Sequence, residues 1–171
     1  MLFRSTPSQA LRAPAAGQVT VVPTAQLHPG LEHLLQVRQT LGLRNSAHSL
    51  VKLLAPTLTS SLLVTSYTHP EYLHSMTATL QLVGQHALLL RATEGEPVAH
   101  PARSPAFDVI RHGTQTRLQE ATPGSWIDQP DWPDMDPAST AQYIQQVLAG
   151  ELPMPASIEN QIQIILRQIS S

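Results

Sequence analysis

Residues 62–91, LLVTSYTHPEYLHSMTATLQLVGQHALLLR, decide the fold. The two ends of this stretch, residues 62–66 and 87–91, are short apolar runs with the length and composition of buried strands. Between them, apolar residues recur at helical spacing over residues 69–82, and Gly84 is a typical helix stop. A strand, a helix and a strand in this order predict a right-handed crossover between two parallel strands, and hence an α/β protein.

Upstream of this stretch the sequence predicts one strand and two helices. Residues 19–22 are β-branched and short, which predicts a buried strand. A helix is expected over residues 29–41, because the proline at its first position suits a helix start and Gly42 suits its end. Asn45 or the adjacent Ser46 caps a second helix, which Pro56 stops.

Downstream, the sequence predicts a β-hairpin and two helices. Residues 107–111 and 116–120 flank the turn sequence His112-Gly113-Thr114. Asp136 caps a helix that reaches Leu148, and a last helix begins at Pro155 or Ser157. The apolar residues of this last helix at helical spacing are Ile158, Ile162, Ile165 and Ile169.

These elements give four expected segments. Residues 1–18 form an irregular leader, residues 19–121 an α/β core, residues 122–137 an irregular linker and residues 138–171 the C-terminal helices. The expected architecture is a mostly parallel sheet followed by helices at the C-terminal end.

The composition excludes several classes of protein. The 171 residues include no cysteine, which excludes disulfides and thiolate metal sites and is consistent with a reducing compartment. The first residues lack the apolar run of a secretory signal, and no apolar stretch approaches the length of a membrane span. We therefore expect a cytoplasmic protein without a membrane partner.

Charge is distributed unevenly along the chain. Residues 1–117 hold nine Lys or Arg and five Asp or Glu, whereas residues 118–171 hold one Arg and seven acids. This asymmetry is a hint of a polyanion-facing side, although a solvated face followed by an acidic tail is the commoner cause. Arg38, Arg44 and Lys52 form a basic region whose side chains suit phosphate or carboxylate, or serve only for solubility and helix capping.

Several separated motifs occur in the order found in a known family. His28-Pro29-Gly30-Leu31, Val37-Arg38 and Leu41-Gly42-Leu43-Arg44 resemble a run in anthranilate phosphoribosyltransferases, of glycosyltransferase family 3. The YbiB-type DNA-binding paralogues of these enzymes are more similar still. The motifs shared with them include Arg44-Asn45-Ser46-Ala47-His48, Thr68-His69-Pro70-Glu71-Tyr72 and Thr93-Glu94-Gly95-Glu96-Pro97. The resemblance covers roughly residues 19–165 and implies part of a nucleoside-phosphorylase/phosphoribosyltransferase-type α/β domain.

The resemblance also implies roles for individual residues. His28 and Arg38 match residues that contact anthranilate in the enzymes, and together with Asn45 they form the expected small-molecule pocket. Glu94 and Glu96 lie near the place of the enzymes' magnesium-binding pair and are the candidates for a metal site. The cations expected along a nucleic-acid backbone are Arg38, Arg44, Lys52, Arg91, Arg103 and Arg111.

The chain departs from the enzymes at two places. Lys52 stands where the enzymes have a substrate-packing proline, which favours the paralogue. The family's Gly-Thr-Gly-Gly loop, whose backbone amides cradle pyrophosphate, has no counterpart in this sequence. We therefore assign no catalytic residue and expect no cofactor, with Mg²⁺ required only by a transferase.

Three functions follow from the resemblance. The first is a protein of the YbiB type that binds single- or double-stranded DNA or RNA without sequence preference, here in a truncated form without transferase activity. The alternative is a glycosyltransferase family 3 enzyme that transfers phosphoribosyl from phosphoribosyl pyrophosphate. The third is an inactive remnant. The family forms homodimers through a helical domain that this chain is expected to lack.

Overall fold

The computed structural model describes residues 19–55, 61–92, 95–124, 133–134 and 136–170. It divides into two compact units, Met1–Leu63 and Val64–Ser171. The expected leader, residues 1–18, and residues 125–132 of the expected linker lie outside the described residues. The four segments expected from the sequence stay predictions, and the division between the units falls inside the expected core.

Unit 1, as described from residue 19, is helical. It contains α1 (Thr24–Leu27), α2 (Pro29–Leu41), α3 (Ala47–Leu50) and a 3-10 turn, η1 (Val51–Leu53). The predicted start and end of α2 are confirmed: His28 is its N-cap, and Gly42 ends it in the left-handed conformation with φ of 69°. The second predicted helix is confirmed as α3 and η1, with a tighter last turn.

The strand predicted at residues 19–22 is wrong. These residues have no regular structure, and the side chain of Val19 is 95% exposed while that of Val21 is 87% exposed. A β-branched run forms a strand when a neighbouring strand accepts its hydrogen bonds and a core covers one face. Among the described residues, no strand pairs with this run.

Unit 2 holds a four-stranded sheet in the order β1-β2-β3-β4. The strands are β1 (Leu63–Tyr67), β2 (Ala87–Arg91), β3 (Phe107–Arg111) and β4 (Thr114–Gln119), with α4 (Tyr72–Leu82) between the first two. Two helices follow, α5 (Pro137–Leu148) and α6 (Ala156–Ile169). The predicted α/β class with C-terminal helices is confirmed.

The predicted mostly parallel character of the sheet is wrong. β1 and β2 form one parallel pair, joined through α4 as the sequence predicted, whereas β2–β3 and β3–β4 are antiparallel. The antiparallel β3–β4 pair follows from the hairpin, whose two turn residues, His112 and Gly113, have φ of 50° and 73°. Positive φ at both positions is typical of a tight hairpin turn, which can join only antiparallel strands.

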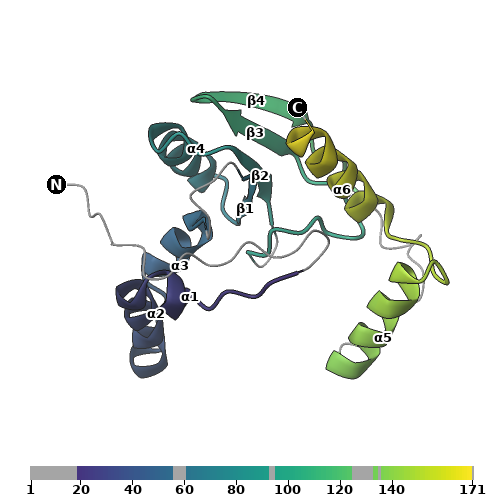
Figure 1. The fold of residues 1–171 in the computed structure, drawn as a ribbon, viewed down its shortest axis with the longest axis horizontal. Coiled ribbons are helices and arrows are strands. Elements are labelled where there is room, and N and C mark those ends of the chain that lie inside the picture. Colours follow the sequence, from purple (N-terminus) through teal and green to yellow (C-terminus); the bar gives the residue numbers. More distant parts are fainter. Residues whose placement is uncertain (1–18, 56–60, 93–94, 125–132, 135, 171) are drawn as a thin grey trace. The chain divides into compact units, whose positions relative to one another are not determined.

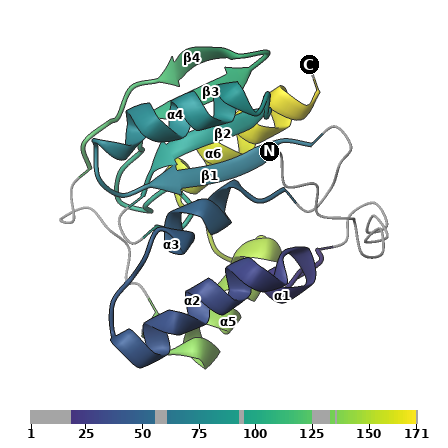
Figure 2. The ribbon, with the colours of Figure 1, turned by 90° about the vertical axis from the view of Figure 1, so that its left-hand side faces the viewer.

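The core of unit 2 lies between two helices. α4 covers one face of the sheet and α6 the other (Figures 1 and 2). Leu88, Leu89, Leu90, Phe107 and Ile110 are fully enclosed between them. Burial of side chains of this size contributes about 1.5–3 kcal/mol each, so the two central strands supply most of the stability of the unit.

The helix α6 is confirmed, but the face that it buries is not its isoleucine stripe. The buried residues are Ser157, Gln161 and Ile164. The Gln161 side chain accepts a hydrogen bond from the backbone N–H of Ala99 at 2.6 Å and donates one to the carbonyl of Pro97 at 2.9 Å. The buried backbone N–H of Ala99 requires a partner, so Gln161, together with Ser157 and Ile164, holds this helix to the rest of unit 2.

Candidate nucleic-acid interface

Unit 1 has a net positive charge because it holds few acidic residues. Its sequence includes five Lys or Arg and one acid, Glu32, whereas residues 64–171 include five Arg and eleven acids. The net charges are therefore +4 and −6. The negative charge of unit 2 lies after residue 117, because residues 64–117 hold four Arg and four acids. Arg38, in the last turn of α2, and Arg44, in the loop that follows, are exposed, and Lys52 in η1 is half-buried.

The loop that carries Arg44 is held by its neighbour Asn45. The Asn45 side chain donates to the backbone carbonyl of Leu34 at 2.7 Å and accepts from the backbone N–H of Ala47 at 2.9 Å. The first bond ties the loop to α2, and the second holds the first N–H of α3, whose N-cap position is Ser46. Arg44 therefore extends from a loop anchored to the helices on both sides.

The three residues of the expected small-molecule pocket all lie in unit 1 but have separate surroundings. The Nδ1 atom of His28 accepts a hydrogen bond from the backbone N–H of Leu31 at 3.0 Å and caps α2. Arg38 lies ten residues further along the same helix, about 15 Å along its axis. Both polar ends of the Asn45 amide bind backbone. A ligand that touches His28 and Arg38 together must span most of α2, and the pocket stays a prediction.

The other three predicted cations belong to unit 2. Arg91 is exposed at the end of β2, Arg103 is exposed in the following loop, and Arg111 is half-buried at the end of β3. Burial lowers the pKa of His86, and the charge of Arg111 lowers it further. Burial likewise lowers the pKa of His100, with a contribution from Arg103. The predicted set is thus divided three and three between the two units.

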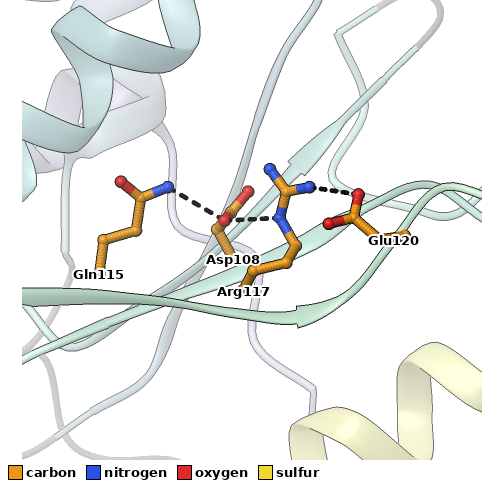
Figure 3. A network of polar contacts seen from close by, with 4 residues as sticks. All are labelled: Asp108, Gln115, Arg117 and Glu120. Carbon is orange, nitrogen blue, oxygen red and sulfur yellow. Dashed lines mark hydrogen bonds and ion pairs between the residues drawn. The ribbon is translucent and has the colours of Figure 1, made fainter.

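A sixth arginine of the folded region, Arg117 on β4, was not among the predicted cations. Its Nε donates to Asp108 Oδ1 at 2.8 Å, and its Nη1 donates to Glu120 Oε2 at 2.7 Å (Figure 3). Gln115 donates to the same Asp108 oxygen at 3.0 Å. Hydrogen bonding to Asp108 is the main cause that raises the pKa of Arg117.

This network belongs to the fold. Asp108 lies on β3 and is 1% exposed, and a buried carboxylate requires a cation and hydrogen-bond donors to offset its lost hydration. Burial, and after it the charge of Asp108, raises the pKa of the nearby Tyr67. In the observed register Arg117 lies directly opposite Asp108, and the predicted hairpin, whose second strand began two residues later, did not give this pairing. The Arg117 guanidinium already binds two carboxylates and is therefore a poor candidate for binding phosphate.

The predicted metal candidates have no further support. Glu94 lies outside the described residues, and Glu96 is half-buried in the loop after β2. Within the described part of the chain, no three His, Asp or Glu side chains come together as metal ligands would. The metal assignment stays a prediction.

Comparison with known proteins gives one relationship of clear significance. No family model matches the chain. Over 153 residues the chain is 37% identical to the uncharacterized protein YbiB of Escherichia coli (strain K12). The chain is homologous to YbiB. The match includes 87% of this chain and 47% of YbiB, so the chain spans about half the length of this relative. None of the helices in the described ranges is long and apolar enough to span a membrane.

Proposed function

We propose that this chain binds nucleic acid without sequence preference, as a YbiB-type protein without transferase activity, and that its basic helical unit makes the main contacts. The observation that carries the proposal is the charge difference between the units, +4 in residues 1–63 against −6 in residues 64–171. Binding that ignores sequence depends on Lys and Arg contacts to phosphate, and it weakens steeply as salt rises.

The positions of the basic side chains suit such contacts. Arg38 and Arg44 are exposed at the end of α2 and just beyond it, and the Asn45 clamp holds the loop of Arg44 in place. A guanidinium on a fixed backbone loses less conformational entropy when it binds phosphate than one on a free loop. Arg91 and Arg103 are exposed cations of unit 2 and offer the same chemistry on that unit.

The test is a titration of a fluorescent single-stranded oligonucleotide at several salt concentrations. The double variant Arg44→Glu, Lys52→Glu is expected to bind at least about tenfold more weakly at low salt. Its salt slope is expected to fall by about 1.4, because each lost phosphate contact on a single strand contributes about 0.7. Two oligonucleotides of unrelated sequence should lose affinity equally.

Arg167→Glu is the matched control, since it reverses an exposed charge on α6, outside unit 1. It should change affinity and slope far less than the double variant. An effect of Arg167→Glu half as large as that of the double variant would show that net charge, rather than the basic unit, governs binding, because one reversal changes the net charge half as much as two. Absence of binding by the wild-type chain, together with a thermal shift caused by anthranilate or phosphoribosyl pyrophosphate, would favour the transferase alternative.

A further inference from the structure

The last two helices present their apolar side chains to one shared hollow. It has a volume of about 630 Å³ and is lined from α5 by Tyr143, Ile144, Val147 and Leu148 and from α6 by Ile158 and Ile162. We call this hollow the α5–α6 groove. Residues spaced three and four apart lie on one face of a helix, so each helix contributes a continuous apolar strip.

The apolar strips are not used to hold the helices in place. α6 is anchored through Ser157, Gln161 and Ile164, and α5 buries no residue completely. Leu148 is 76% exposed and Ile144 is 50% exposed. Apolar surface gathered around a concave site is typical of a region that binds another molecule.

The segments that form the groove hold more acidic than basic residues. Among the described residues from 133 to 170 there are four acids, Asp134, Asp136, Glu151 and Glu159, and one base, Arg167. Asp134 belongs to the lining itself. Arg167 follows Ile158 by nine positions, about two and a half turns, and therefore lies on the opposite side of α6 from the groove.

The negative charge near the groove favours one kind of binding partner over another. A second copy of the chain that presented the same groove would bring like charges together, which opposes association. A helix with an apolar face flanked by Lys or Arg fits both the shape and the charge, as in other helix-in-groove complexes. We propose that the α5–α6 groove binds a basic amphipathic helix of a partner protein.

Three labelled peptides of about 14 residues test the proposal with the full-length chain. The first is a Leu/Lys peptide with leucine at helical spacing, the second is a Leu/Glu peptide with the same leucine positions, and the third has the Leu/Lys composition in scrambled order. The first should bind at least about tenfold more tightly than either of the others by fluorescence anisotropy.

Variants assign the binding to the groove. Leu148→Gln should weaken binding of the Leu/Lys peptide about tenfold, because burial of one leucine side chain is worth roughly that factor. Leu82→Gln on α4, where the native leucine is 87% exposed, is the matched control and should leave affinity unchanged. Both wild-type residues are exposed, so both variants are expected to fold, and circular dichroism verifies this.

Two results would overturn the proposal. One is equal binding of the ordered and scrambled Leu/Lys peptides, which would reduce the interaction to net charge. The other is self-association of the wild-type chain in sedimentation that Leu148→Gln abolishes, which would make a second copy the occupant.

Discussion

The two units of the molecule are stabilised in different ways. In the described residues, unit 1 buries two apolar side chains, Leu31 and Ala47, whereas unit 2 buries fifteen. Leu34, Leu41, Leu43 and Leu50 of unit 1 are at least half exposed. Its helices are defined by local bonds, such as the His28 and Asn45 caps, and those of unit 2 by a packed sheet.

The difference separates two sources of structure. Caps and turn residues determine where a helix begins and ends, while burial supplies most of the free energy of folding. Unit 1 has caps and turn residues but few buried side chains, and it also has the net positive charge. A basic surface that binds phosphate requires exposed cationic side chains. A core is stabilised when apolar side chains are removed from water.

The largest expected effect tests the difference in burial. Phe107→Ala in β3 removes a fully buried ring and should lower the free energy of unfolding of unit 2 by about 3–5 kcal/mol. Leu34→Ala in α2 removes a side chain that is 50% exposed and should cost less than about 1 kcal/mol. Hydrogen exchange of peptides from β2 and α2 reports each unit separately. Equal losses of unfolding free energy in the two variants would contradict the conclusion that burial stabilises unit 2 more than unit 1.

A second variant tests the buried ion pair. Arg117→Ala leaves the Asp108 carboxylate buried with Gln115 as its remaining donor, so we expect a loss of about 3 kcal/mol in urea unfolding. Arg117→Lys keeps the charge and should lose less. Asp108→Asn in the Arg117→Ala background should recover part of the stability, because it removes the uncompensated charge. A double variant no more stable than Arg117→Ala would show that charge burial is not the cause.

The smallest expected effect concerns pH. The pKa of His86 is lowered in the fold, chiefly by burial, so protons bind the unfolded imidazole more tightly than the folded one. Its contribution to stability is complete above the ordinary pKa of 6.5 and is lost as pH falls through the folded value. His86→Gln should therefore flatten the decline of stability on acidification, and an NMR titration should place the ring's pKa below 6.5. A midpoint at or above 6.5 would contradict the assignment.

The sequence predicted best those elements that depend on local signals. β2 and α5 follow from an apolar run and the Asp136 cap, and both lie where they were expected. The hairpin follows from the His112-Gly113 turn, but its second strand begins at Thr114 rather than at residue 116. Asp136 accepts from the backbone N–H groups of Ala138 and Ser139, as a capping residue should.

Features set by distant residues escaped prediction. The antiparallel pairing of β3 with β2 depends on which strand lies beside β3, and a pattern within one strand does not specify that. The buried face of α6 depends on the backbone at Pro97 and Ala99, so its isoleucine stripe indicated a helix but not the side that faces the sheet. The basic residues were recognisable in the sequence, whereas their division between two units required the structure.

The contact between Gln161 and Ala99 also bears on the order of folding. It joins residues 62 positions apart, whereas β3 and β4 are joined by a tight turn. Closing a long loop costs more chain entropy than closing a short one, so contacts near in sequence form sooner. We expect the hairpin to form early and α6 to dock last, once the loop at residues 97–101 has taken its shape. Until then, the open face of the sheet is the part of the nascent chain most exposed to misassembly.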